Sequence, residues 1–168
     1  RCFIKEAKRL NEVCKYNCNI VDVNEVFEAN GTAYFVMEYL DGGNLRQVVK
    51  NSKGGLTEAE AISIIKPIAE ALQVMHSRKF LHLDIKPDNI VMRHGENGLK
   101  DEPVLIDFGV SVHFDKSGHV TTTHNNAGYS VGYSPIEQYC AIDKFSPWCD
   151  VYALSATFLY LLTGKDPV

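Results

Sequence analysis

The chain has 168 residues and a mass of 18.8 kDa, with 45% hydrophobic and 23% charged residues. These fractions are ordinary for a globular protein, so they exclude a disordered or fibrous chain. The formal net charge is −4 and the sequence pI is about 5.9. Because there is no basic excess, we expect no nucleic-acid partner.

The cysteine content indicates a reducing compartment. There are five cysteines, and an odd number scattered through a chain of this length does not suit a secreted disulfide framework. The longest apolar run, residues 151–162, is shorter than the roughly 20 residues that cross a bilayer. We therefore expect a cytoplasmic location, free thiols and no membrane span in this chain.

Residues 1–77 predict three helices and one hairpin. An apolar stripe with helical spacing covers residues 1–15, and two β-prone runs, 20–27 and 33–39, flank Asn30-Gly31, a strong hairpin signal. A short helix is expected over 44–50. Thr57 with Glu60 forms a capping box that opens a long helix ending near Ser77. Pro67 should kink that helix or shift its hydrogen bonds.

The second half predicts short strands, a long loop and a final helix. Residues 80–107 alternate short apolar runs with polar turns, and residues 110–130 are polar with little periodicity, which is typical of a functional loop. Ser146-Pro147 is a helix start, and the following segment to Leu162 is apolar on almost every side. Such a helix is expected to be buried.

Polar side chains gather at the ends of apolar runs. Asp84 and Asn89 lie between two such runs, and Asp107 follows a third. Charges at these places are costly unless they bind something. Carboxylate and amide oxygens suit Mg²⁺, which usually arrives with substrate phosphates. Each residue alone is as well explained by a turn or a helix cap.

Taken in order, the motifs resemble those of eukaryotic-type (Hanks-type) Ser/Thr protein kinases, and Gln138-Tyr139 is similar to bacterial members of the family. His82-x-Asp84-x-Lys86-Pro87-x-Asn89 and Asp107-Phe108-Gly109 are similar to the catalytic and magnesium loops. Phe35 to Leu40 looks like the last strand of the small lobe and the hinge, residues 132–137 like the close of the activation segment, and residues 150–154 like the start of the anchoring helix. The resemblance covers essentially the whole chain.

This resemblance implies an α+β, protein-kinase-like fold. Residues 1–40 would be a small-lobe remnant (helix C and two strands) with the hinge, and residues 41–168 the mainly helical first half of the large lobe. It also implies ATP and Mg²⁺ as cofactors and a protein substrate bearing Ser or Thr. Self-association of the chain is expected if apolar faces are left exposed.

The resemblance further implies a role for each site residue. Asp84 would accept or orient the substrate proton, Lys86 would steady the γ-phosphate, and Asn89 and Asp107 would hold Mg²⁺. The nucleotide-binding set comprises Glu6, Met37 as gatekeeper, Glu38, Leu40, Val91 and Asp107. Leu10, Val23, His82 and Phe108 would form a hydrophobic spine, with Leu10 and Val23 equally well explained as core residues.

Three departures from the family pattern stand out. Leu83 occupies the place of an Arg that would bind a phosphate on the activation segment, so we expect activity not to depend on phosphorylation there. Ile136 replaces the usual Pro beside Glu137. No Gly-rich loop or ATP-contacting Lys strand precedes Glu6, and Lys5, Lys8 and Lys15 cannot substitute. We therefore expect the 168 residues to be a truncated domain with little activity alone.

Two other functions stay open. One is a pseudokinase, a scaffold or nucleotide-binding module without phosphoryl transfer, against which Asp84, Asn89 and Asp107 argue. The other is a small-molecule kinase of the aminoglycoside type, which shares an Asp-x-x-x-x-Asn loop. That class lacks the Asp107-Phe108-Gly109 triplet, so it ranks last.

Overall fold

The computed structural model describes residues 15–52, 54–95, 100–115, 117, 119–121, 128–140 and 145–167. The predicted N-terminal helix, with Glu6 and Leu10, lies outside the described residues. The strands are β1 Val23–Ala29, β2 Thr32–Met37, β3 Phe80–Leu81, β4 Ile90–Arg93, β5 Glu102–Leu105 and β6 Val112–His113. The helices are α2 Leu45–Asn51, α3 Glu58–Ser77, the 3₁₀ helix η1 Pro87–Asn89, α4 Ile136–Tyr139 and α5 Pro147–Thr163.

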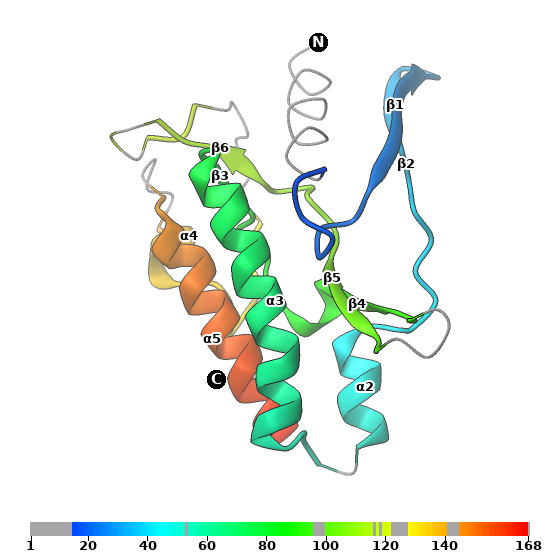
Figure 1. Ribbon diagram of the computed structural model, residues 1–168. Helices are drawn as coiled ribbons and strands as arrows, with labels where there is room; N and C mark the ends of the chain where they lie inside the picture. The colour runs from blue at the N-terminus through cyan, green and yellow to red at the C-terminus, as the bar shows by residue number, and fades with distance from the viewer. Residues whose placement is uncertain are drawn as a thin grey trace.

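The hairpin β1–β2 forms at the predicted turn. Ala29 pairs with Thr32, and Asn30 and Gly31 adopt φ angles of 52° and 74°, which a two-residue hairpin turn requires. The first strand begins later than the predicted residue 20, because the residues before it join a different sheet. Ile20 forms a parallel bridge to Leu105 of β5. The hairpin stands apart from the helices (Figure 1).

Helix α3 is the centre of the mainly helical body. Thr57 caps it as predicted, with the Thr57 N–H donating to Glu60 Oε2 at 2.8 Å, and the helix runs unbroken through Pro67 to Ser77. Figure 1 shows α5 beside α3 along much of its length, with α2 and the β4–β5 sheet on the other side. The main core lies between these elements and includes Leu45, Ile68 and Leu161, each fully buried.

Helix α5 corrects one prediction. It begins at Pro147 and ends at Thr163, with Gly164 as its C-cap at a φ of 66°, but it is not buried on all sides. Trp148 is 74% exposed and Tyr152 is 51% exposed. Helix α5 packs on α3 and β3. Its buried residues recur with helical spacing along one face: Cys149, Asp150, Ala153, Thr157, Tyr160 and Leu161. An apolar composition therefore overstated its burial.

The loop predicted over residues 110–130 is also partly wrong. Val112 and His113 form β6, which pairs with β3, and Phe114 bridges to Val120. The pairing of β6 with β3 places the start of this segment beside the residues that lead into Asp84. Within the described residues, no helix is both long and apolar enough to cross a membrane.

Candidate active site

The backbone that leads into the site is fixed by the first turn of α5. The carboxylate of Asp150 accepts hydrogen bonds from the backbone N–H groups of His82 and Leu83, at 3.0 and 2.8 Å. Asp150 is fully buried, and His76 of α3 contacts the same carboxylate at 2.8 Å. Leu83 has a φ of 64°, a conformation that a non-glycine residue keeps only when its surroundings hold it. These contacts fix the backbone directly before Asp84.

The Asp84 carboxylate is the centre of the site. Lys86 Nζ lies 3.0 and 2.8 Å from its two oxygens. Ser130 Oγ donates to Oδ1 at 2.7 Å and accepts from Lys86 Nζ at 3.0 Å. Asn89 Nδ2 donates to Oδ2 at 2.8 Å and to the Asp84 carbonyl at 2.9 Å. An acidic group held in one orientation beside a lysine and a hydroxyl suits proton handling at a bound hydroxyl.

Asn89 connects this centre to Asp107. The β4–β5 pairing places Ile90 opposite Leu105, and the Ile106 N–H donates to the Asn89 carbonyl at 2.9 Å. Asp107 comes next in the chain, is exposed, and has a φ of 62°, with its Oδ1 accepting from the Gly109 N–H at 3.1 Å. Asn89 uses its amide nitrogen on Asp84, and among the described residues no group donates a hydrogen bond to its amide oxygen. An amide oxygen and a carboxylate are ligands that fit Mg²⁺.

His82 contacts both the segment around Asp84 and the segment around Asp107. Its Nδ1 accepts from the Asp84 N–H at 3.3 Å, and its Nε2 donates to the Ile106 carbonyl at 3.1 Å. Its ring meets Phe108 edge-on, with centroids 5.1 Å apart. Burial lowers the pKa of His82, although the nearby charges of Asp150, Asp84 and Asp107 oppose that effect. The neutral ring therefore ties the Asp84 and Asp107 segments together.

The comparisons with known proteins agree with this arrangement. The model of the family described as "Protein kinase domain" matches residues 1–168. The chain belongs to this family. It is 35% identical to serine/threonine-protein kinase PknA of Nostoc sp. over 98% of the chain and 28% of PknA. It is 34% identical to serine/threonine-protein kinase B of Synechocystis sp. over 98% of the chain and 28% of the relative.

A third relative is similar. Serine/threonine-protein kinase C of Synechocystis sp. is 32% identical over 98% of the chain and 30% of the relative. The chain therefore spans less than a third of the length of these curated relatives. The recognition of a Hanks-type kinase from the motifs, and the kinase-like α+β fold, are both confirmed.

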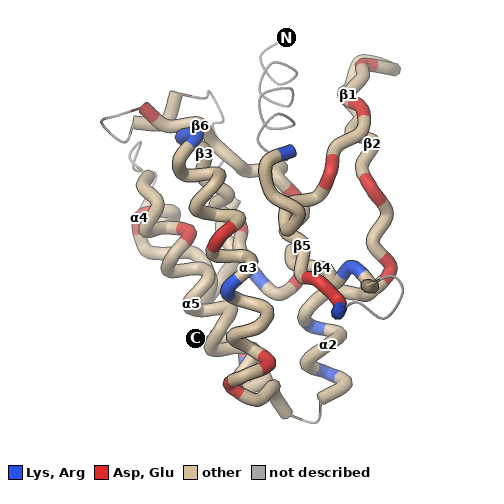
Figure 2. Tube along the Cα trace, in the orientation of Figure 1, with Lys and Arg blue, Asp and Glu red and all other residues tan. Residues whose placement is uncertain are grey.

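The hinge expected in this kinase family follows β2. Met37 ends the strand and is 44% exposed, and the Glu38 N–H donates to the Asp22 carbonyl at 3.0 Å. The Glu38 side chain is held by Arg93 of β4, at 2.5 Å between Oε1 and the guanidinium. Figure 2 shows only acidic charges along this hairpin and hinge. An ion pair to β4 thus anchors the hinge to the mainly helical body.

Two other residues predicted to contact the nucleotide are Leu40 and Val91. Leu40 lies two residues after Glu38 and is half-buried. Val91 of β4 is half-buried and bridges to Asn44, the N-cap of α2. The Gly42 N–H and the Gly43 carbonyl both pair with Met92, at 3.1 and 2.9 Å. A Cβ on Gly42 would lie 2.3 Å from the Met92 carbonyl oxygen, so only glycine fits this approach.

Leu83 is one of a second group of buried residues. It is 2% exposed and packs with Leu81, Val112, Phe114, Phe145 and Cys149. We call this group the Leu83 cluster. It joins the segment before Asp84 to β6 and to the start of α5, so apolar packing holds the segment that follows Asp107.

Sequence reasoning missed several residues that the structure brings to the site. Gln138 donates its side-chain N–H to the Leu83 carbonyl at 2.9 Å, and Arg46 contacts Asp88 beside the catalytic loop at 2.6 Å. Ser130 also belongs to the site, because its hydroxyl donates to Asp84 at 2.7 Å. No local pattern signals Gln138 or Arg46, because their partners are 55 and 42 residues away.

Proposed function

We propose that this chain supplies the hinge, catalytic loop and magnesium loop of a protein kinase that transfers the γ-phosphoryl group of ATP to Ser or Thr hydroxyls of a protein. The observation that carries the proposal is the Asp84 carboxylate, held at 3.0 Å or less by Lys86, Ser130 and Asn89. Phosphoryl transfer needs mainly positioned groups and compensated charge, which this arrangement offers.

In this mechanism, Asp84 orients the substrate hydroxyl and receives its proton as the oxygen bonds to the γ-phosphorus and the bond to the departing ADP oxygen breaks. Lys86 compensates charge on the transferred group. Ser130 fixes Lys86 and Asp84 relative to each other. A lysine and a hydroxyl at these two places support Ser/Thr rather than Tyr as the acceptor.

The nucleotide would be held by residues on both sides of the site. We assign Asn89 Oδ1 and the Asp107 carboxylate to Mg²⁺, which would neutralise phosphate charge when bound. The carbonyl of Glu38 and the backbone of Leu40 would meet adenine, with Met37 and Val91 lining its pocket. Glu6 is proposed for the ATP-contacting lysine from the family resemblance alone. Free thiols at Cys18, Cys140 and Cys149 support a cytoplasmic location.

The proposal is tested by Asp84→Asn in the full-length protein. Transfer of radiolabel from ATP to a generic protein substrate should fall by a factor of about 10² to 10⁴. Asp101→Asn is the matched control, since Asp101 is exposed and its partners in the described part of the chain are His94 and Gly95. Wild-type protein that binds Mg-ATP but transfers no phosphate would contradict the proposal and favour the scaffold function.

A further inference from the structure

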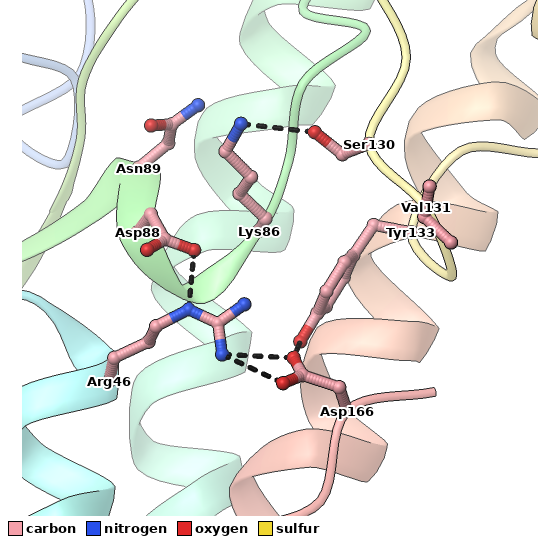
Figure 3. Close-up of a pocket in the computed structure, with 8 residues that line it drawn as sticks. All are labelled: Arg46, Lys86, Asp88, Asn89, Ser130, Val131, Tyr133 and Asp166. Atoms are coloured by element: carbon pink, nitrogen blue, oxygen red, sulfur yellow. Dashed lines mark hydrogen bonds and ion pairs between the residues drawn. The ribbon is translucent and has the colours of Figure 1, made fainter. Parts of the chain in front are cut away.

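A cavity of about 640 Å³ opens beside the catalytic loop. Three of its lining residues, Lys86, Asn89 and Ser130, belong to the site described above. The others come from four separate parts of the chain: Arg46, Asp88, Val131, Tyr133 and Asp166. Figure 3 shows them arranged around one space, with Ser130 and Lys86 at one end and Arg46 and Asp166 at the other. A polypeptide with its hydroxyl at Asp84 must therefore present a neighbouring side chain to this cavity.

Arg46 occupies the acidic end of the cavity. Its Nε lies 2.6 Å from Asp88 Oδ2, and its Nη1 lies 2.9 and 3.2 Å from the two oxygens of Asp166. The guanidinium carbon also lies 5.1 Å from the ring centroid of Tyr160 and 5.9 Å from that of Tyr133, within cation–π range. One arginine of α2 therefore bridges η1 and the segment after α5.

The carboxylates of Asp88 and Asp166 are both paired with groups of this chain. The Tyr133 hydroxyl donates to Asp166 Oδ1 at 2.7 Å, which together with Arg46 lowers the pKa of Asp166. Burial lowers the pKa of Arg46, but its bonds to Asp88 and Asp166 outweigh this and raise it. Lys86, the other cation that lines the cavity, is engaged by Asp84. Asp88 and Asp166 therefore share Arg46 as their cationic partner.

This pairing has a consequence for substrates. Two carboxylates next to a catalytic loop would attract a lysine or arginine of a substrate. Here the guanidinium of Arg46 already fills the position that such a basic group would take. A basic side chain could bind only by displacing Arg46 from two ion pairs, whereas an uncharged side chain can lie against Val131 and the ring of Tyr133.

We propose that this cavity receives the side chain next to the phosphoacceptor hydroxyl, and that Arg46 is the specificity-determining residue that prevents selection of a basic side chain there. The preferred substrate is a polypeptide segment with an uncharged residue at this position. The inference rests on the proposed kinase function and deepens it.

The test compares the full-length wild-type protein with Arg46→Gln. The substrates are peptides with a single Ser, in which one flanking position at a time carries Lys, Gln or Glu. For wild type, we expect Lys peptides to give a kcat/KM no higher than that of Gln peptides. For Arg46→Gln, the Lys-to-Gln ratio should rise about tenfold at the position that enters the cavity, since one ion pair is then available to the substrate.

Two further variants test whether the effect of Arg46→Gln comes from the lost charge at this position. Arg46→Lys keeps a cation beside Asp88 and Asp166, so its Lys-to-Gln ratio should stay close to that of wild type. Arg78→Gln removes the same charge at the far end of α3, where Arg78 stacks on Tyr16 with 3.6 Å between the guanidinium carbon and the ring centroid. It should also leave the ratio unchanged. An Arg46→Gln ratio equal to that of wild type would overturn the inference.

A binding measurement makes the result independent of catalysis. Fluorescence anisotropy with the same peptides, in which Ala replaces Ser, gives the Lys-to-Gln ratio of affinities for each variant. If no peptide is phosphorylated but Arg46→Gln alone gains affinity for a Lys peptide, the proposed function fails, and only the exclusion of a basic side chain by Arg46 stands. If phosphorylation occurs and neither ratio moves, the role of Arg46 is wrong and the proposed function stands.

Discussion

The buried side chain of His82 makes the stability of the folded chain depend on pH. Its side chain is fully buried, and burial lowers its pKa below the ordinary value of 6.5. The unfolded chain therefore binds the proton more readily than the folded chain. Stability from this residue is complete above about pH 6.5 and is lost as the pH falls toward the lowered native pKa.

We expect this effect to appear as a pH-dependent difference between wild type and His82→Phe. At pH 7 the variant should be less stable in urea, because the bonds of His82 to Ile106 and Asp84 are lost. As the pH falls from 7 to 5, the difference should shrink by up to about 1.4 kcal/mol per pH unit. Asp150, Asp84 and Asp107 face His82 in both proteins, so the comparison isolates the histidine. Parallel stability curves would contradict this assignment.

At the scale of elements, the connection between α2 and α3 is fastened to the end of α5. The Leu56 N–H donates to the Leu161 carbonyl at 2.7 Å. Gly55 has a φ of 127°, and a Cβ there would lie 2.3 Å from the Leu162 carbonyl oxygen. Gly54 has a similar φ of 122°, but a Cβ there would meet nothing within 4 Å. A substitution at Gly54 therefore introduces backbone strain alone, whereas one at Gly55 introduces the same strain and a steric clash.

Gly55→Ala should therefore destabilise the protein more than Gly54→Ala. The Gly54 variant should lose about 1–3 kcal/mol through backbone strain alone. The Gly55 variant carries the same strain plus the clash with α5, and we expect at least about 2 kcal/mol more, as for other overpacked sites. Urea unfolding of both variants measures the difference. Equal losses would show that α5 yields without cost.

The elements differ in how far the sequence could predict them. The Asn30-Gly31 turn and the Thr57 cap depend on neighbouring residues, so local patterns located them correctly. The partial burial of α5 depends on which elements cover it, and an apolar composition carries no such information. Arg46 contacts Asp166 across 120 residues, and a contact between residues so far apart leaves no local pattern in the sequence. The motifs thus predicted the centre of the candidate site, whereas its substrate-side wall required the structure.

At the scale of the whole molecule, the Leu83 cluster joins three separate parts of the fold. Leu83 precedes Asp84, Val112 and Phe114 follow Asp107, and Cys149 lies in the first turn of α5. An arginine in place of Leu83 could bind a phosphate on the segment after Asp107, whereas a leucine cannot. Here β3–β6 pairing and apolar burial hold the start of that segment. We infer that packing, rather than phosphorylation, sets its conformation.

The direct test replaces Thr121, Thr122 and Thr123 together with Ala in the full-length protein. Thr121 bonds to His113 at 2.8 Å through its hydroxyl, so a loss of about 1 kcal/mol of stability is expected. Kinase activity should nevertheless stay within about threefold of wild type, because one net hydrogen bond of this size leaves the site itself intact. Phosphatase treatment of wild type should leave the rate equally unaffected.

The complementary change is Leu83→Arg, with Leu83→Met as the volume-matched control. An arginine at a position that is 2% exposed places an unpaired charge in an apolar cluster, which should destabilise the protein by at least about 3 kcal/mol. Methionine should cost less than about 1.5 kcal/mol. If the triple Ala variant loses its activity while Leu83→Arg folds normally, the segment depends on phosphorylation and the packing argument is wrong. If instead the triple variant stays active and only Leu83→Arg unfolds, the Leu83 cluster takes the place of a phosphate in ordering the substrate side of the kinase site.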